Sequence, residues 1–173
     1  TAGFKEVGDE GRQLEDRISQ IARRGNIRMI GPNCLGVIST SNNLNASFGG
    51  DLPAPGGTAY ISQSGALLAA ILDMANHQGI GFSKLISIGN KADVNELDLI
   101  HALDQDPDTR VIAGYLESID DGNLFAREAE KISKQKPVLL IKSGSTSAGA
   151  QAASSHTGSL AGGETAYEAV FKK

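Results

Sequence analysis

The sequence of 173 residues contains no tryptophan, three tyrosines and five phenylalanines, so it offers little aromatic surface on which a flat ring could stack. Its single cysteine, Cys34, excludes an internal disulfide and fits a reducing compartment. A net charge of -4 leaves no basic footprint, which argues against nucleic acid as a partner. No apolar run reaches membrane-spanning length, and no signal-peptide pattern opens the sequence. We therefore expect a cytoplasmic protein that binds neither nucleic acid nor membrane.

Glycine, in contrast, is unusually frequent, at 21 residues, whereas hydrophobic residues at 40% and charged residues at 21% are ordinary for a globular protein. Many glycines with few aromatic residues favour tight turns and close backbone approaches. The first residues, from Thr1 to Arg12, look like the middle of a domain, and the last ten, ETAYEAVFKK, stop inside a helical pattern. We expect the chain to be a piece of a longer protein.

One helix is predicted near the start of the chain, at residues 9–24. Asp9 is a possible N-cap, and Leu14, Ile18 and Ile21 form an apolar stripe along the predicted helix. Glycine follows the last turn, as is common at helix C-termini.

The stretch after this helix has little regular pattern. A short strand is predicted at 26–30, and residues 39–57, which are rich in Gly, Pro and Asn, are interpreted as a connection. A further short strand is possible near 37–38. This change of character predicts a division into residues 1–50, the end of one domain with a linker, and residues 51–173, a second domain.

From residue 58 onwards, apolar runs alternate with segments of helical pattern. The predicted elements are strand 58–62, helix 66–77, strand 84–88, helix 95–103, strand 110–116, helix 121–133, strand 137–141 and helix 162–173. In the first of these helices, Leu67, Ile71 and Met74 are predicted to face inward. Strands separated by single helices predict a parallel sheet covered on both faces, which is a doubly wound, flavodoxin-like α/β domain.

Ligands of such sheets bind beyond the carboxyl ends of the strands. The segments that follow the predicted strands, at 62–66, 89–93, 117–122 and 143–158, should therefore meet at one edge. We expect the functional residues of this protein to lie in these four segments.

The first of these segments, Ser62-Gln63-Ser64-Gly65-Ala66, leads directly from a strand into a helix. Free amides in the first turn and the positive end of the helix dipole could hold a phosphate there, and the Ser64 hydroxyl could add a donor. An ordinary turn with a serine N-cap explains the same residues. The lysine and the spacing of a P-loop are absent.

Glu117 ends the third predicted strand and should point into the ligand crevice. There it could accept a hydrogen bond from an imidazole, fix the tautomer of the ring and stabilise positive charge on it. The alternative is a solvated surface acid at a strand end.

His156 lies in a long loop of small residues, Ser143 to Gly163, that follows the last predicted strand. Its neighbours Thr157 and Gly158 lead towards a helix start, which offers a second set of free amides for an anion. We interpret His156 as a phosphoryl carrier, although a histidine in such a loop is often only a surface residue.

The other residues with reactive side chains are interpreted as structural. His77 and His101 lie on predicted helices, and Cys34 has no base near it in the sequence. No Cys/His cluster has the spacing of a zinc site, so no metal site is predicted.

A series of motifs, taken together and in this order, resembles the NDP-forming acyl-CoA synthetases, namely the ADP-forming acetate–CoA ligases and the related alpha subunit of succinyl-CoA synthetase. The motifs are GFKEVGDEG at 3–11, RMIGPNCLGVI at 28–38, ISQSGAL at 61–67, SIGNKADVNELDL at 87–99, YLESI at 115–119, KPVLLIKSG at 136–144 and SSHTGSLAG at 154–162. GNKADVNE and SSHTGSLAG look more like the acetate type than like succinyl-CoA synthetase.

The resemblance implies that acyl-CoA, phosphate and ADP interconvert with carboxylate, CoA and ATP. It implies a fold of the succinyl-CoA synthetase type, preceded by the end of a Rossmann-like CoA-binding domain. CoA and ADP or ATP with Mg would be substrates of the complete enzyme, and none of them would be tightly bound by this chain. The partners implied are an ATP-grasp domain or beta subunit, a CoA thioester and a small carboxylate, in an oligomeric assembly.

The resemblance also implies roles for individual residues. His156 matches the histidine that is phosphorylated by an acyl phosphate and swings to the nucleotide site, and Glu117 matches the glutamate that orients it. Phosphate would be held by Ser64, Gly65, Ala66, Thr157 and Gly158. The substrate and CoA region would include Asn33, Cys34, Ser62, Gln63, Asn90 and Asp93.

Two other functions remain open from the sequence. A non-catalytic flavodoxin-like binding module would use the same fold, although few aromatic residues are available to stack a flavin ring. A scaffold fused to a protein acetyltransferase domain is the second alternative, against which the presence of His156 argues. The acyl group and the choice of ADP or GDP are not determined by these residues.

Overall fold

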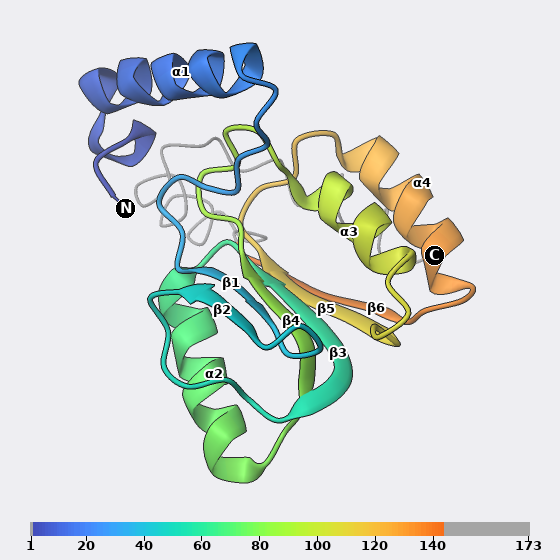
Figure 1. Ribbon diagram of the computed structural model, residues 1–173. Helices are drawn as coiled ribbons and strands as arrows, with labels where there is room; N and C mark the ends of the chain where they lie inside the picture. The colour runs from blue at the N-terminus through green and yellow to red at the C-terminus, as the bar shows by residue number, and fades with distance from the viewer. Residues whose placement is uncertain (1, 144–173) are drawn as a thin grey trace.

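The structure, a computed structural model, describes residues 2–143 (Figure 1). Six strands form a single sheet in the order β2-β1-β4-β3-β5-β6. The strands are β1 (Gly36–Ser39), β2 (Leu44–Ser47), β3 (Pro55–Ser62), β4 (Phe82–Ser87), β5 (Val111–Leu116) and β6 (Val138–Lys142). The helices are η1 (Lys5–Val7), α1 (Asp9–Arg24), α2 (Gly65–Gln78), α3 (Glu96–Asp104) and α4 (Gly122–Ser133).

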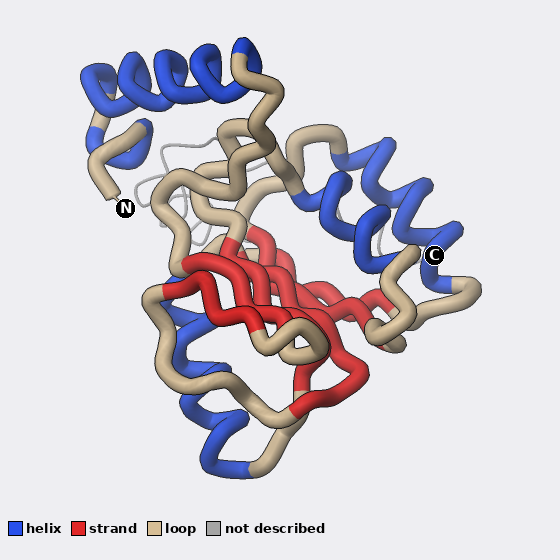
Figure 2. Tube along the Cα trace, in the orientation of Figure 1, coloured by secondary structure: helices blue, strands red, loops and turns tan. Residues whose placement is uncertain are grey.

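The four strands β3 to β6 are parallel to one another and follow the spatial order β4-β3-β5-β6. The chain therefore starts in the middle of this parallel part, moves to one side for β4 and then to the other for β5 and β6. This is the doubly wound order of flavodoxin-like folds. Helix α2 covers one face of the sheet, and α3 and α4 cover the other (Figures 1 and 2). The predicted fold class is confirmed.

Two hydrophobic clusters lie on the two faces of the sheet. Ala59 and Ile61 of β3 belong to the cluster with α3 and α4, whereas Tyr60 belongs to the cluster with α2. This alternation follows from the two-residue period of a strand, and it requires an almost continuous apolar run because both faces are buried. The central strands are thereby fixed, and the segments at their carboxyl ends rest on a rigid base.

The stretch interpreted as a connection contains a hairpin. Strand β1 confirms the short strand suspected near residues 37–38, and it pairs antiparallel with both β2 and β4. Strand β2 was not predicted, because its residues are mostly exposed and carry no alternating apolar pattern. The hairpin belongs to the same sheet as β3 to β6, and the division at residue 50 stays a prediction.

The strand predicted at residues 26–30 is wrong. The segment at 29–32 instead accepts three hydrogen bonds from the loop after β4, from Asn90 N to Pro32 O at 2.9 Å, Ala92 N to Gly31 O at 2.9 Å and Val94 N to Met29 O at 3.1 Å. The amide of Met29 is used by a side chain, the carboxylate of Asp93, at 2.7 Å. Donation therefore runs in one direction only, and a regular ladder does not form.

Helix α1 has the predicted bounds but not the predicted packing. Gly8 precedes it without a side-chain cap, and Leu14 and Ile21 are exposed by 45% and 58%. Gly11 and Glu15 are buried instead. A Cβ at Gly11 would lie 1.9 Å from the carbonyl oxygen of Phe4, so glycine permits this close approach of the backbone.

The buried face of α2 agrees only in part with the prediction, because Ile71 packs against the core and Met74 does not. Leu68, Leu72 and Ala75 are buried, whereas Met74 is 43% exposed. Nearly every position in the first two turns is apolar, so the period of the sequence does not select a face. The predicted helices at 95–103 and 121–133 agree with the structure: Asn95 forms a capping box on α3, and Asp121 caps α4.

The helix predicted at 162–173 lies outside the described residues, as does the loop of small residues after Ser143. Within residues 2–143, none of the helices is both long and apolar enough to cross a membrane.

Candidate functional site

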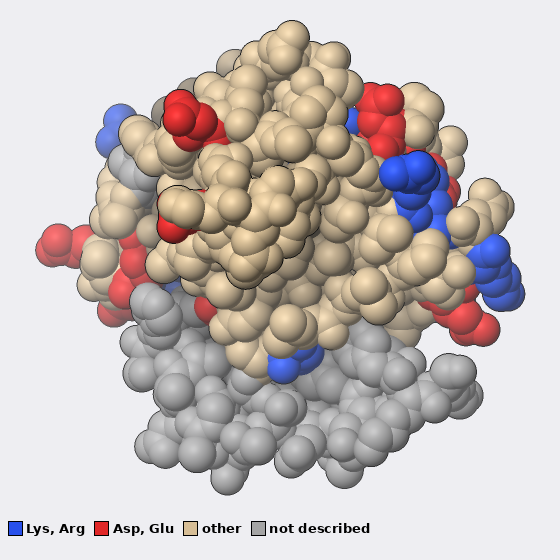
Figure 3. All heavy atoms as spheres, turned by 90° about the horizontal axis from the view of Figure 1, so that it is seen from below, with Lys and Arg blue, Asp and Glu red and all other residues tan. Residues whose placement is uncertain are grey.

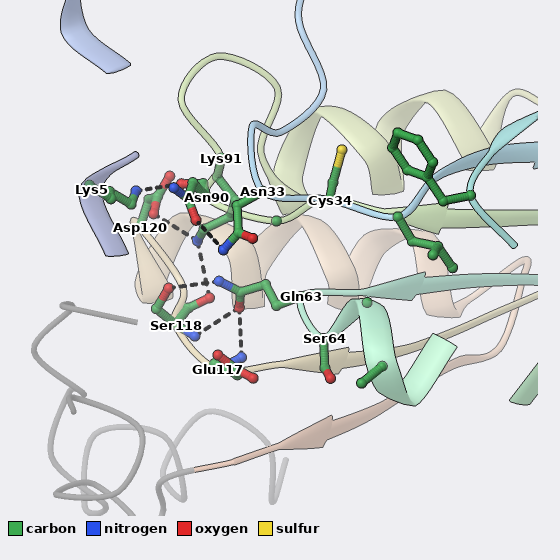
Figure 4. Close-up of a pocket in the computed structure, with 15 residues that line it drawn as sticks. Lys5, Asn33, Cys34, Gln63, Ser64, Asn90, Lys91, Glu117, Ser118 and Asp120 are labelled. Atoms are coloured by element: carbon green, nitrogen blue, oxygen red, sulfur yellow. Dashed lines mark hydrogen bonds and ion pairs between the residues drawn. The ribbon is translucent and has the colours of Figure 1, made fainter. Parts of the chain in front are cut away.

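The carboxyl ends of β3, β4 and β5 meet around a cavity of ≈ 390 Å³ (Figure 4). Eight of the residues predicted for the site line it: Asn33, Cys34, Gln63, Ser64, Gly65, Ala66, Asn90 and Glu117. They come from four separate stretches of the sequence, and the parallel sheet brings these stretches to one edge.

Five predicted residues do not line this cavity or lie outside the described part of the chain. Ser62 is fully buried beneath the turn, and Asp93 is bound to the Arg28 side chain and the Met29 amide. His156, Thr157 and Gly158 fall outside residues 2–143, so their roles stay predictions.

The start of α2 presents unused donors to the cavity. The Ser64 hydroxyl accepts the Leu67 amide at 3.1 Å, and this N-cap leaves its hydrogen available. Ser62 Oγ donates to the Ser64 carbonyl at 2.7 Å and accepts the Ser64 amide at 3.1 Å, which holds the turn. Among residues 2–143 the amides of Gly65 and Ala66 find no acceptor. Two free amides, a hydroxyl and the helix dipole make this turn suited to an anion.

The loop after β4 packs closely against the segment at 31–35. Gly89 has a φ of +53°, and a Cβ there would lie 2.2 Å from the Pro32 carbonyl oxygen. Asn33 donates from its side-chain amide to Asn90 Oδ1 at 3.2 Å. The amide of Leu35 donates to Ser87 Oγ at the end of β4, at 2.9 Å. These contacts fix one wall of the cavity.

Asn90 joins this wall to the N-terminal part of the chain. Its side-chain nitrogen donates to Glu6 Oε2 and to Glu15 Oε2, both at 2.7 Å, and its carbonyl accepts a bond from Lys5 Nζ. Burial acts to raise the pKa of Glu6, but hydrogen bonds from Asn90 and nearby amides outweigh it and lower the pKa. The amide of Asn90 is therefore used mainly to bind protein carboxylates.

Cys34 has the features of a buried, unreactive thiol. It is half-buried, and its Sγ lies 3.7 Å from the Ile30 carbonyl oxygen. Burial raises the pKa of the thiol, so the thiolate is disfavoured at neutral pH. Cys34 lies in the wall of the cavity, and within residues 2–143 its thiol makes no hydrogen bond to an activating base.

The turn that carries Glu117 is held by side chains from the neighbouring strand ends. Gln63 Oε1 accepts the amides of Glu117 at 2.6 Å and Ser118 at 2.9 Å. Lys91 Nζ donates to the Ser118 carbonyl at 3.1 Å and to Asp120 Oδ1 at 2.8 Å. Figure 4 shows the side chains of Gln63 and Lys91 reaching towards this turn.

Lys142, at the end of β6, lies on the other side of this turn. Its Nζ donates to the Glu117 carbonyl at 2.8 Å and also to the Ser143 carbonyl. Burial lowers the pKa of this lysine, while the charge of Glu117 acts in the opposite direction. Lys142 therefore lies within electrostatic reach of the Glu117 carboxylate.

A second, more apolar cavity of ≈ 650 Å³ adjoins the first, and Asn33, Cys34, Leu35 and Phe48 line both of them. Its other lining residues include Phe4, Met29, Ile30, Pro32, Val37 and Ala46. The shared wall places an apolar space beside the polar one.

Several lining residues were missed by the sequence reasoning, namely Lys5, Leu35, Phe48, Lys91, Ser118 and Asp120. Lys91 directly follows Asn90 in a segment that was assigned to the ligand edge, so position alone could have identified it. The position of Lys5 in the sequence gives no such indication, because Lys5 lies 85 residues before Asn90, whose carbonyl it binds at the cavity.

The remaining candidate features lie away from this edge. The side chains of His77 and His101 are 79% and 51% exposed and lie near Asp73 and Glu128. In the part of the chain that is described, no group of three or more His, Cys, Asp or Glu side chains is arranged to hold a metal ion. The face in Figure 3 carries scattered charges at its margins rather than a patch of Lys and Arg.

A family model described as a succinyl-CoA ligase like flavodoxin domain matches residues 55–173. The chain belongs to this family. An ADP-forming acetate–CoA ligase of Methanocaldococcus jannaschii is 53% identical over all of this chain, which spans 24% of that relative. The alpha subunit of ADP-forming acetate–CoA ligase II of Pyrococcus furiosus is 47% identical, again over the whole chain, which spans 38% of that subunit.

The fold is also found in solved structures of the same family. A dinucleotide-forming acetyl-coenzyme A synthetase 1 of Ca. Korarchaeum cryptofilum, solved with phosphate and ADP, superimposes with a TM-score of 0.94 at 44% identity. The match covers 99% of this chain and 37% of that one. The chain thus spans between about a quarter and two fifths of the length of these relatives.

Proposed function

We propose that this chain is part of an NDP-forming acid–CoA ligase, which interconverts acyl-CoA, phosphate and ADP with carboxylate, CoA and ATP. The reaction would pass through an acyl phosphate and a phosphohistidine at His156. The observation that carries this proposal is the cavity at the carboxyl edge of the sheet. There the start of α2 and the Glu117 turn line one space, in a chain whose relatives are named as ADP-forming CoA ligases over its whole length.

The start of α2 is the phosphate-binding site in this proposal. Phosphoryl transfer needs little covalent help from a protein and depends on positioning and on donors that stabilise charge. The free amides of Gly65 and Ala66 and the Ser64 hydroxyl supply such donors without a lysine.

Glu117 orients His156 in this proposal. A neutral imidazole is a good nucleophile near pH 7, and a carboxylate on its other nitrogen fixes the tautomer and stabilises the charge that forms on phosphorylation. Glu117 lines the same cavity as Ser64, which supports this role.

The nucleotide site belongs to a partner in this proposal, either an ATP-grasp domain in the same polypeptide or a beta subunit. The relatives include both longer single chains and an alpha subunit, which supports either arrangement. CoA, a small carboxylate and ADP or ATP with Mg would be the substrates. The enzyme would be located in the cytoplasm.

Phosphorylation of the full-length gene product, together with any separate nucleotide-binding subunit, tests this proposal. Incubation with labelled ATP and magnesium should give a phosphoprotein that is labile to acid and stable to base. A His156→Ala variant should lose the label completely, and full labelling of that variant would contradict the assignment.

Glu117→Gln tests the orienting role separately. The variant should be labelled about a hundredfold to ten-thousandfold more slowly, because positioned general acid–base groups contribute effects of this order. A rate equal to that of the parent protein would remove the proposed role of Glu117 and leave that of His156 standing.

A further inference from the structure

Side chains from other elements bind three amides and two carbonyls of the turn after β5. The amides of Glu117 and Ser118 bind Gln63, and the amide of Asp120 donates to Glu96 Oε1 at 2.8 Å. The carbonyls of Glu117 and Ser118 bind Lys142 and Lys91. Connecting segments run over the surface, where such groups can bind water, whereas here side chains from other elements bind them.

Gln63 supports the turn from the end of β3. Both lone pairs of its side-chain oxygen are used by the two amides, and its nitrogen donates to Ser118 Oγ at 3.1 Å. Its own amide donates to the Tyr115 carbonyl at 3.0 Å, so its backbone continues the pairing with β5. Both ends of the Gln63 amide are thus committed to the turn, although the residue also lines the cavity.

Lys91 supports the turn from the end of β4. Its ammonium has three hydrogens, and these meet Glu96 Oε2 at 2.8 Å, Asp120 Oδ1 at 2.8 Å and the Ser118 carbonyl at 3.1 Å. The Lys91 and Glu96 side chains are 4% and 2% exposed. The donors of Lys91 are therefore consumed by protein groups, and this lysine is not a phosphate ligand despite its place beside the cavity.

We propose that Gln63, Lys91 and Lys142 are positioning residues, which hold the Glu117 turn at a fixed distance from the start of α2. The inference rests on the proposed role of Glu117. The three side chains come from the ends of β3, β4 and β6, so the turn is tied to every parallel strand around it. A carboxylate that orients a nucleophile gains from such support, because a misplacement of about 1 Å can lower a rate by about a hundredfold.

A substitution at Gln63 tests this inference with the least disturbance of charge. In Gln63→Met the side chain keeps its length and loses its bonds to the Glu117 and Ser118 amides. We expect kcat for ATP formation from acetyl-CoA, phosphate and ADP to fall about tenfold to a hundredfold, with KM for phosphate within about twofold of the parent value. Gln105→Met is the matched control, because Gln105 is exposed and, within residues 2–143, its side chain binds only Asp104.

Gln63→Glu tests whether the acceptor is what matters. A carboxylate can still accept both amides, and the Ser118 hydroxyl can turn to donate to it. This variant should recover most of kcat, while its added negative charge raises KM for phosphate. Hydrogen exchange provides a readout besides activity: the Glu117 and Ser118 amides should lose protection in Gln63→Met and keep it in Gln63→Glu.

The outcomes separate the inference from the function on which it rests. A parent protein without phosphohistidine or ligase activity overturns both. An active parent protein with an unchanged kcat in Gln63→Met overturns only the positioning role. A rise in KM for phosphate with an unchanged kcat in Gln63→Met would make Gln63 a phosphate ligand. Equal losses of kcat in the Met and Glu variants would mean that the acceptor is irrelevant.

Discussion

The start of α2 and the turn that carries Glu117 face the same cavity, yet they treat their backbone polar groups in opposite ways. At the start of α2, the amides of Gly65 and Ala66 find no acceptor within residues 2–143. In the turn, the amides of Glu117, Ser118 and Asp120 are all bound by side chains. One element keeps its donors for a ligand, and the other gives them to the protein.

This difference shows how the two parts of a phosphate site can have different tasks. A seat for an anion needs donors that are not yet satisfied, and the helix around it maintains their direction. A residue that orients a reacting group needs a fixed backbone, which requires satisfied donors. Both solutions use polar residues of the same motifs, so sequence alone does not distinguish them.

Lys91→Met should have the largest effect and would break the support of the turn. It leaves Glu96 buried without its ammonium partner, and loss of one member of a buried ion pair costs about 3–5 kcal/mol of unfolding free energy. Urea denaturation of the folded protein measures this change. Lys131→Met, which removes an exposed ammonium next to Glu128, is the control and should change the unfolding midpoint far less.

The double variant Lys91→Met/Glu96→Gln sharpens the same test. With no uncompensated buried charge, it should recover part of the stability lost in Lys91→Met. If Lys91→Met unfolds at the same urea concentration as the parent protein, the network is not buried as described, and its role in holding the turn would be wrong.

Ser64→Ala tests the start of α2, and Asp121→Ala at the start of α4 is its matched control. Both side chains are N-caps, at 3.1 Å from the Leu67 amide and 2.9 Å from the Leu124 amide, so each variant should lose about 1 kcal/mol of stability. Only Ser64→Ala should also weaken phosphate binding, by about tenfold or more, because a hydrogen bond to a charged group contributes about 1.5–3 kcal/mol. Calorimetric titration with inorganic phosphate measures this. Equal phosphate affinity in the two variants would exclude the Ser64 hydroxyl as a ligand.

Gly65→Ala should have the smallest effect. A Cβ at this position would lie 3.6 Å from Leu35 atoms, which is ordinary van der Waals contact, and the backbone of Gly65 does not require a left-handed conformation. We expect stability to stay within about 1 kcal/mol and phosphate affinity within about twofold of the parent values. A loss of more than tenfold in affinity would show that the anion approaches the backbone where the new methyl group lies.

Much of the fold could be predicted because it depends on local patterns. Buried parallel strands appear as apolar runs, and Asn95 and Asp121 mark helix starts by their own side chains. The location of the cavity followed from the same reasoning, because carboxyl ends of parallel strands meet at one edge. Ser64 and Glu117 could thus be placed near each other before any coordinates.

What could not be predicted depends on contacts between distant residues. The hairpin of β1 and β2 exists because β4 offers an edge, and the segment at 29–32 is held by a loop some 60 residues further along. The role of Gln63 is a similar case. Its motif indicated a ligand site, whereas its amide binds a turn 54 residues away, for which no signal exists in the motif itself.

Lys91 has one more property, which concerns the engineering of this protein. Its φ of 56° lies in the left-handed region, where glycine is the usual choice for a more stable loop. Design on backbone grounds would favour Lys91→Gly and would delete the ammonium that binds three acceptors. Thermostabilising libraries should therefore leave this position fixed, because the substitution that best suits its backbone is the one that dismantles its side-chain network.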